Sequence, residues 1–149
     1  MSQYVTFLLA DHLYGIDVQR VQEALRAPAR TRVPLATPDV AGLVNLRGQV
    51  VLTIDLRARL GLPPADDEPA MTVVVQVDSE PVSLLVDAIG DVVECGPGTF
   101  ELPPPTLDAR LSALVRGVHK LDDRLLLVLD VDAAVSPQSS RTALPEELR

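Results

Sequence analysis

The carboxylates near the ends of the predicted strands are the residues best placed to do chemistry. Asp55, Asp130 and Asp132 could in principle supply a general acid and a general base. However, Asp55 and Asp130 stand directly before short helical patterns, where an aspartate accepts hydrogen bonds from the free N–H groups of the first turn. Asp17 stands before a third such pattern. We therefore expect Asp17, Asp55 and Asp130 to be structural caps, and a small hydrolase using Asp55 and Asp130 is the alternative.

Other reactive side chains are few. The chain has two histidines, His12 and His119, and one cysteine, Cys95, at spacings that do not suggest a metal cluster or a Cys-His dyad. The sequence also lacks the usual phosphate-binding and nucleophile motifs. We therefore expect a protein that is not an enzyme and that needs no metal and no cofactor. A single cysteine cannot form an intramolecular disulfide and favours a reducing compartment.

Arg47 is the first candidate for binding. Residues 42–46 and 49–54 are apolar and rich in β-branched side chains, and Arg47 with Gly48 forms a turn between them, which predicts a β-hairpin. Residues 50–54 leave little room for a polar face, so we expect this strand to be covered on both sides. An arginine at so apolar a tip should direct its five donors at a group outside the hairpin.

The hairpin occurs twice in the sequence. Adding 75 to each number places Gly42 on Gly117 and Asp55 on Asp130, and a weaker match sets residues 7–17 over residues 75–87. Two related β-rich halves are the simplest interpretation. The net charge of −8 disfavours nucleic acid or an anionic membrane as the main partner. No basic leader and no apolar run of about 20 residues is present, so we expect a cytoplasmic protein without direct membrane insertion.

The spacing of turns predicts about ten strands and two or three short helices, a mainly β fold of two linked small barrels. One helix is expected over residues 17–26, because Val18, Val21 and Leu25 fall on one side of a helix. The barrels would span residues 3–62 and 71–135, with a linker at 63–70, strands able to cross between them, and a disordered tail at 136–149. A ligand-binding barrel would need an enclosed cavity, whereas the aliphatic content predicts a filled interior.

Five motifs, in this order and spacing, resemble the CheW family of chemotaxis coupling proteins. They are LYGIDV (13–18), VQE (21–23), GLVNLRG (42–48), TIDLR (53–57) and LVDAIGDV (85–92). The resemblance runs over nearly the whole chain, so the CheW-like domain would cover residues 1–135. It implies two five-stranded, SH3-like barrels packed together and a protein without catalytic activity.

The resemblance also implies partners. A CheW-like adaptor joins the cytoplasmic tips of chemoreceptors, at the inner face of the membrane, to the regulatory domain of a CheA-type histidine kinase, and contacts with other CheW-like copies would also fit. The same scaffold in another two-component pathway, such as twitching motility or gene regulation, is the alternative within the family. The residues implied for receptor binding are Val18, Val21 and Glu23 on the expected helix, Gly42 and Arg47 on the hairpin, and Ile89 and Val92 in the second half. Kinase contacts would come from apolar residues at exposed hairpin ends, which the sequence does not identify.

Overall fold

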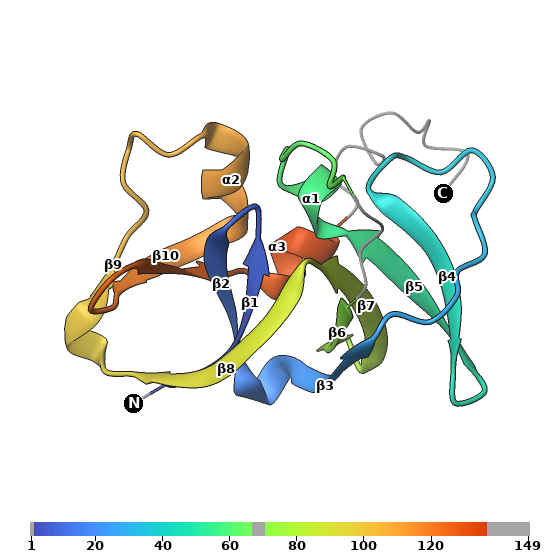
Figure 1. The fold of residues 1–149 in the computed structure, drawn as a ribbon, viewed down its shortest axis with the longest axis horizontal. Coiled ribbons are helices and arrows are strands. Elements are labelled where there is room, and N and C mark those ends of the chain that lie inside the picture. The colour runs from blue at the N-terminus through green and yellow to red at the C-terminus, as the bar shows by residue number, and fades with distance from the viewer. Residues whose placement is uncertain (1, 67–70, 137–149) are drawn as a thin grey trace.

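Two β-sheets make up the fold in the computed structural model, which describes residues 2–66 and 71–136 (Figure 1). The six-stranded sheet has the order β8-β1-β2-β11-β10-β9 and is formed by β1 (Ser2–Leu9), β2 (His12–Asp17), β8 (Ala88–Cys95), β9 (Phe100–Glu101), β10 (Val115–Lys120) and β11 (Leu125–Leu129). The five-stranded sheet has the order β3-β6-β7-β5-β4 and is formed by β3 (Val21–Arg26), β4 (Val40–Leu46), β5 (Gln49–Asp55), β6 (Met71–Val77) and β7 (Glu80–Val86).

The helical segments are short and lie at the ends of strands. They are the 3-10 turns η1 (Val18–Arg20) and η2 (Pro97–Thr99) and the helices α1 (Leu56–Arg59), α2 (Ala109–Leu114) and α3 (Val131–Val135). The expected mainly β class with a few short helices is therefore confirmed. The expected tail lies almost wholly outside the described residues, as does the second half of the expected linker.

Both sheets repeat one pairing pattern. Five strands of each sheet follow it, in the spatial orders β8-β1-β2-β11-β10 and β3-β6-β7-β5-β4. In each order the first two neighbouring pairs are antiparallel, the third is parallel and the fourth is antiparallel. The parallel pairs are β2–β11 and β5–β7. The hairpin β4–β5 therefore corresponds to β10–β11, and β6–β7 corresponds to β1–β2, which accounts for both matches within the sequence. Because β1 and β2 join strands from the far end of the chain, the sheets do not coincide with residues 3–62 and 71–135.

The central hairpin forms where the sequence predicts it. Arg47 has φ 53° and Gly48 has φ 84°, the left-handed pair that a tight hairpin turn needs. The prediction that the following strand is covered on both faces holds only at the end of the strand, where Thr53 and Ile54 are both buried, and it is wrong for residues 50–52. Val51 is buried, but Val50 is 67% exposed and Leu52 is 36% exposed. Side chains alternate along a strand, so over residues 50–52 the described residues cover only one face of β5.

The prediction of a helix over residues 17–26 is also wrong. Only η1 is helical, and residues 21–26 form β3, which pairs antiparallel with β6. Along β3 half-buried and exposed residues alternate, because Val21, Glu23 and Leu25 lie two positions apart and share one face. Between β3 and β4 the chain forms an isolated β-bridge, between Thr31 and Leu43.

One apolar core joins the two sheets. Phe7 and Tyr14 of the six-stranded sheet are fully buried in the same cluster as Val73 and Leu84 of the five-stranded sheet. Within the described residues the chain crosses between the sheets twice, from β2 to β3 through η1 and from β7 to β8 through the single residue Asp87. These two crossovers set how the sheets lie relative to one another.

Candidate functional site

Val18 and Val21 lie at the first crossover, where the chain leaves β2 and enters β3. Asp17 caps η1, and its carboxylate accepts a hydrogen bond from the Gln19 N–H at 2.9 Å. Val18 and Val21 are half-buried, and Val21 packs against the main core. Each valine therefore keeps part of its apolar surface accessible at the junction of the sheets.

Glu23 and Arg47 form an ion pair with two hydrogen bonds. Arg47 Nη2 lies 2.6 Å from Glu23 Oε1, and Nη1 pairs with Oε2. Arg47 was expected to direct its donors at a group outside the hairpin, and Glu23 on β3 is such a group. Because β3 and β4 are the two edges of the five-stranded sheet, this pair links the opposite edges. The hydrogen bonds from Arg47 lower the pKa of Glu23, and the side chain of Arg47 is still 68% exposed.

Gly42 has a backbone role. It is buried with φ +142°, and a Cβ at this position would lie 2.5 Å from the carbonyl oxygen of Thr31. That close approach allows Thr31 and Leu43 to exchange two backbone hydrogen bonds, of 2.9 and 2.8 Å. The loop between β3 and β4 is thereby fastened to the outer edge of β4.

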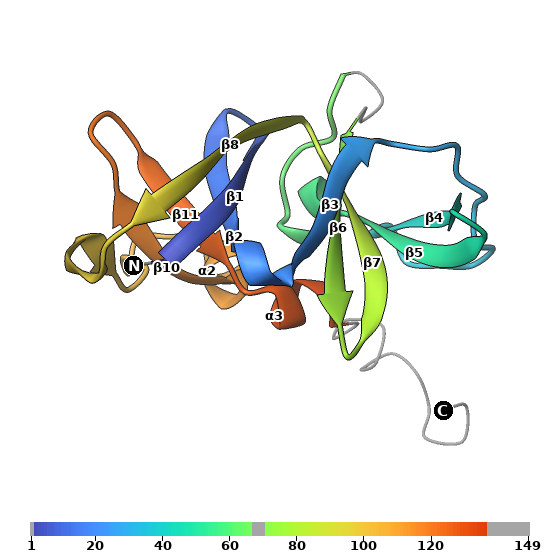
Figure 2. The ribbon, with the colours of Figure 1, turned by 90° about the horizontal axis from the view of Figure 1, so that it is seen from below.

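Ile89 and Val92 lie on β8, the edge strand of the six-stranded sheet. Ile89 is half-buried against the main core, whereas Val92 is 57% exposed. β8 pairs with β1 on one side, and no other described strand pairs with its outer edge. In Figures 1 and 2, β8 and β3 are neighbouring edge strands at the junction of the sheets. The structure thus places Val18, Val21 and the Glu23–Arg47 pair on one side of this junction, and Ile89 and Val92 on the other.

Asp55 and Asp130, two of the three carboxylates considered for catalysis, act as helix caps. Asp55 Oδ1 accepts hydrogen bonds from the N–H groups of Arg57 at 3.0 Å and Ala58 at 3.4 Å. Asp130 Oδ1 accepts one from the Ala133 N–H at 3.1 Å. Among the described residues, no group of three or more His, Cys, Asp or Glu side chains is arranged to hold a metal ion.

Three arginines that no sequence pattern singles out tie the sheets together. Arg20 bonds to Asp132, and Arg57 bonds to Asp87. Arg59 is buried, and it donates to the Ala134 carbonyl at 2.8 Å and to Asp39 at 3.1 Å. These four partners lie 20 to 112 positions away in the sequence, so no local pattern points to them.

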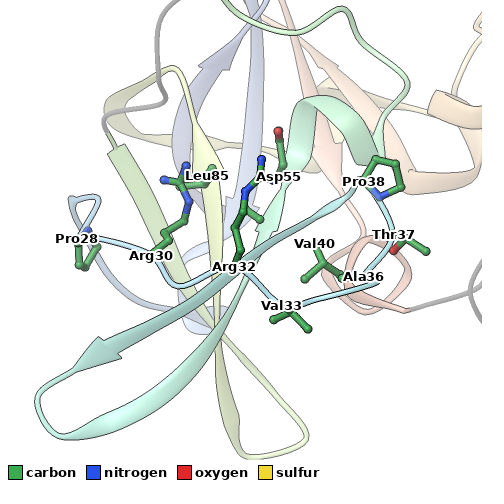
Figure 3. A pocket seen from close by; sticks show the side chains of 12 residues that line it. Pro28, Arg30, Arg32, Val33, Ala36, Thr37, Pro38, Val40, Asp55 and Leu85 are labelled. Carbon is green, nitrogen blue, oxygen red and sulfur yellow. The ribbon is translucent and has the colours of Figure 1, made fainter.

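A polar pocket of about 590 Å³ lies under the loop that joins β3 and β4 (Figure 3). No motif in the sequence predicts this pocket. Figure 3 shows the side chains of Arg30 and Arg32 extending to the same side of the loop, near Asp55 and Leu85. None of the residues expected at the receptor-binding site lines this pocket.

Comparison with known proteins decides the family. The family model described as a CheW-like domain matches residues 3–138. The chain belongs to the CheW family. A relative named Chemotaxis protein CheW, from Bacillus subtilis (strain 168), is 31% identical, and the match covers 98% of this chain and 94% of the relative. A Probable chemotaxis protein CheW from Rhizobium etli is 30% identical, with 95% and 92% covered.

A solved structure has the same CheW fold. The scaffolding protein TtCheW from Thermoanaerobacter tengcongensis matches with a TM-score of 0.78 and 29% identity, over 87% of this chain and 88% of that one. Among the described residues, no helix combines the length and the apolar character needed to span a bilayer.

Proposed function

We propose that this protein is a non-enzymatic adaptor in chemotaxis signalling, which couples the cytoplasmic tips of transmembrane chemoreceptors to a CheA-type histidine kinase. The observation that carries the proposal is the family match over residues 3–138. The names of the relatives, a chemotaxis protein and a scaffolding protein, support the same role. The protein would then act in the cytoplasm, at receptor clusters on the inner face of the membrane.

The receptor would bind at the junction of the sheets. Helix-in-groove recognition needs accessible apolar side chains flanked by a polar group that sets the register. Val18, Val21 and Val92 supply the apolar surface, and Ile89 adds to it. The largely exposed guanidinium of Arg47 has donors beyond those that bind Glu23, and these would meet a carbonyl or an acidic group of the receptor.

The kinase would bind at exposed apolar hairpin ends. Val50 and Leu52 are exposed on β5 next to the β4–β5 tip, and Leu125 is 49% exposed at the start of β11. Neighbouring apolar side chains on a surface often mark a protein interface. Val50 lies three residues from Arg47 on the same hairpin, whereas Leu125 belongs to the other sheet. A kinase bound at Leu125 would therefore leave Arg47 free for the receptor. The identity of the kinase would distinguish chemotaxis from twitching motility or gene regulation.

The first test is affinity capture of partners by the wild-type protein and by Arg47→Ala, from detergent-solubilised cells, read by mass spectrometry. We expect both baits to recover a CheA-type kinase and the wild type alone to recover chemoreceptors. The melting temperature should change little, because the Glu23–Arg47 pair is exposed to solvent. Lys120→Ala is the matched control, since Lys120 also forms an exposed ion pair, with Glu101.

Two results would count against this assignment. If the wild type recovers neither a kinase nor a chemoreceptor, the adaptor function is wrong. If Arg47→Ala lowers the melting temperature strongly and loses both partners, Arg47 stabilises the fold and is not a receptor contact.

A further inference from the structure

The two crossovers between the sheets are equivalent in the repeated fold, and an arginine–aspartate pair holds each one. β2 corresponds to β7, so Asp17 corresponds to Asp87. At the second crossover, Asp87 pairs with Arg57 of α1 at 2.6 Å. At the first, Arg20 pairs with Asp132 of α3 at 2.7 Å. Positions 57 and 132 differ by 75, the repeat distance, so these two members of the pairs occupy matching places. Their partners do not match, because Asp87 corresponds to Asp17 and not to Arg20.

The two pairs differ in exposure. The side chains of Arg57 and Asp87 are 16% and 26% exposed, and Asp87 also accepts a hydrogen bond from the Ala10 N–H. The side chains of Arg20 and Asp132 are 35% and 67% exposed. An ion pair so exposed contributes little to the stability of a fold. The first crossover is therefore held by contacts that can be changed without unfolding the protein.

Arg20 joins three segments at the first crossover. Its Nε and Nη2 donate to the Gln76 carbonyl at the end of β6, at 3.2 and 2.9 Å. Its Nη2 and Nη1 donate to Asp132 of α3, at 2.7 and 3.4 Å. Asp132 raises the pKa of Arg20, mainly through these hydrogen bonds. Figure 2 shows the η1 turn, in blue between β2 and β3, beside α3 and the end of β6.

The residues next to Arg20 are those expected to contact the receptor. η1 consists of Val18, Gln19 and Arg20, and Val21 follows directly. Neither valine makes a side-chain hydrogen bond, so the direction of their side chains depends on the backbone of η1. That backbone is held at its start by the Asp17 cap and at its end by the guanidinium of Arg20.

We propose that Arg20, clamped between Asp132 and the Gln76 carbonyl, is a positioning residue for receptor binding: it fixes η1 so that Val18 and Val21 face the receptor in one orientation. The inference rests on the proposed adaptor function. It assigns a role in binding to Asp132, a residue on α3 that was expected neither at the receptor surface nor at the hairpin ends.

The experiment compares wild type with Asp132→Asn and Arg20→Lys, and uses Glu101→Gln as the control. Asp132→Asn keeps the shape of the side chain but removes its charge, and Arg20→Lys keeps the charge but cannot bridge two acceptors in a fork. Glu101→Gln removes a carboxylate from another exposed ion pair, also 2.7 Å long. Three quantities are measured for each protein. They are the methyl NMR resonances of Val18 and Val21, the melting temperature, and the affinity for a soluble chemoreceptor-tip fragment encoded in the same genome.

We expect the Val18 and Val21 methyl resonances to shift in both variants, whereas the melting temperature falls by no more than about 2–4 °C. Affinity for the receptor fragment should fall by about 2- to 30-fold, and affinity for the kinase should not change. Because Arg20 would act through Asp132, Arg20→Ala and Asp132→Ala should be non-additive in a double-mutant cycle. Glu101→Gln should behave as wild type in every measurement.

Either of two results would overturn the inference. Unchanged methyl resonances in Asp132→Asn would show that the pair does not fix η1. A loss of affinity in Arg20→Ala but not in Asp132→Asn would make Arg20 a direct contact. If the wild type itself does not bind the fragment, the receptor-binding function fails, and the NMR spectra still show independently whether the pair positions η1.

Discussion

Gly42 and Gly48 lie on the same hairpin and both have positive φ, but only Gly42 is crowded. Gly42 has φ +142°, with the Thr31 carbonyl oxygen 2.5 Å from the place where a Cβ would stand. Gly48 has φ +84° and no atom within 4 Å of that place. A side chain at Gly48 would meet only backbone strain, whereas a side chain at Gly42 would also separate the loop from β4.

Gly42→Ala should therefore cost more stability than Gly48→Ala. We expect Gly48→Ala to lower the free energy of unfolding by about 1–2 kcal/mol, the usual cost of a left-handed conformation for a residue with a Cβ. Gly42→Ala should lower it by about 2–4 kcal/mol, because the strain is joined by the loss of the Thr31–Leu43 hydrogen bonds. Urea unfolding at equilibrium measures both values. Equal losses would mean that the loop moves aside without cost and that the crowding at Gly42 is unimportant.

The role of a residue was predictable from the sequence where its hydrogen-bond partner lies a few residues away in the chain. The Asp55 cap follows from position alone, since its donors are two and three residues further along the chain. The partner of Arg47 is Glu23, 24 residues earlier on another strand. Both residues had been assigned to one site through the family resemblance. Their bond to each other required the fold, because nothing in a single sequence shows which strand edges come together.

At the scale of elements, β3 shows how a long-range partner decides between two local patterns. Val18, Val21 and Leu25 fit the spacing of a helix, and Val21, Glu23 and Leu25 fit that of a strand. The segment is a strand because the backbone of β6 offers antiparallel partners to all of its residues except Gln22, where the register shifts. The hairpins β4–β5 and β6–β7 were predictable, since each is closed by a short turn and needs no distant partner.

His119 on β10 makes the end of the six-stranded sheet sensitive to pH. It is buried, Nδ1 lies 2.8 Å from Thr99 Oγ1, and Nε2 lies 3.2 Å from the hydroxyl of Tyr4. Burial lowers the pKa of His119 below its usual value of 6.5. The unfolded chain therefore binds a proton more readily than the folded one, so stability is full above about pH 6.5 and is lost as the pH falls.

His119→Gln should remove this part of the pH dependence. Between pH 7.5 and 5.5 the melting temperature of the wild type should fall, and that of His119→Gln should fall less, because glutamine binds no proton. His12 is exposed at the start of β2, so His12→Gln is the matched control and should keep the wild-type dependence. Parallel curves for wild type and His119→Gln would show that other groups cause the loss.

At the scale of the whole molecule, the duplication was visible in the sequence but the exchange of strands was not. The 75-residue repeat matches the hairpin β4–β5 to the hairpin β10–β11, and each hairpin forms within its own half of the chain. However, β1–β2 joins the later hairpin through the parallel pair β2–β11, and β6–β7 joins the earlier one through β5–β7. The hairpin β1–β2 would bury the same apolar side chains beside either β4–β5 or β10–β11, so the apolar pattern alone could not distinguish these two pairings. The exchange produces the two crossovers that the arginine–aspartate pairs hold.

Asp87 should be the more important of the two crossover aspartates for the stability of the molecule. It alone connects β7 to β8, and it accepts hydrogen bonds from Arg57 at 2.9 and 2.6 Å and from the Ala10 N–H at 2.9 Å. Asp87→Asn should lower the free energy of unfolding at pH 7 by about 1–2 kcal/mol, allowing for partial screening by solvent. Asp132→Asn should lower it much less, because its pair is more exposed.

The pH dependence offers a second test of Asp87. The hydrogen bonds from Arg57 lower the pKa of this carboxyl below its ordinary value of 3.8. Its contribution to stability is therefore present above about pH 4 and is lost as the pH falls through the lowered pKa of the folded state. Urea unfolding of wild type and Asp87→Asn at pH 7 and at successively lower pH should show the difference between them shrinking below pH 4. A difference that stays constant down to pH 2 would mean that the charge of Asp87 does not hold the crossover.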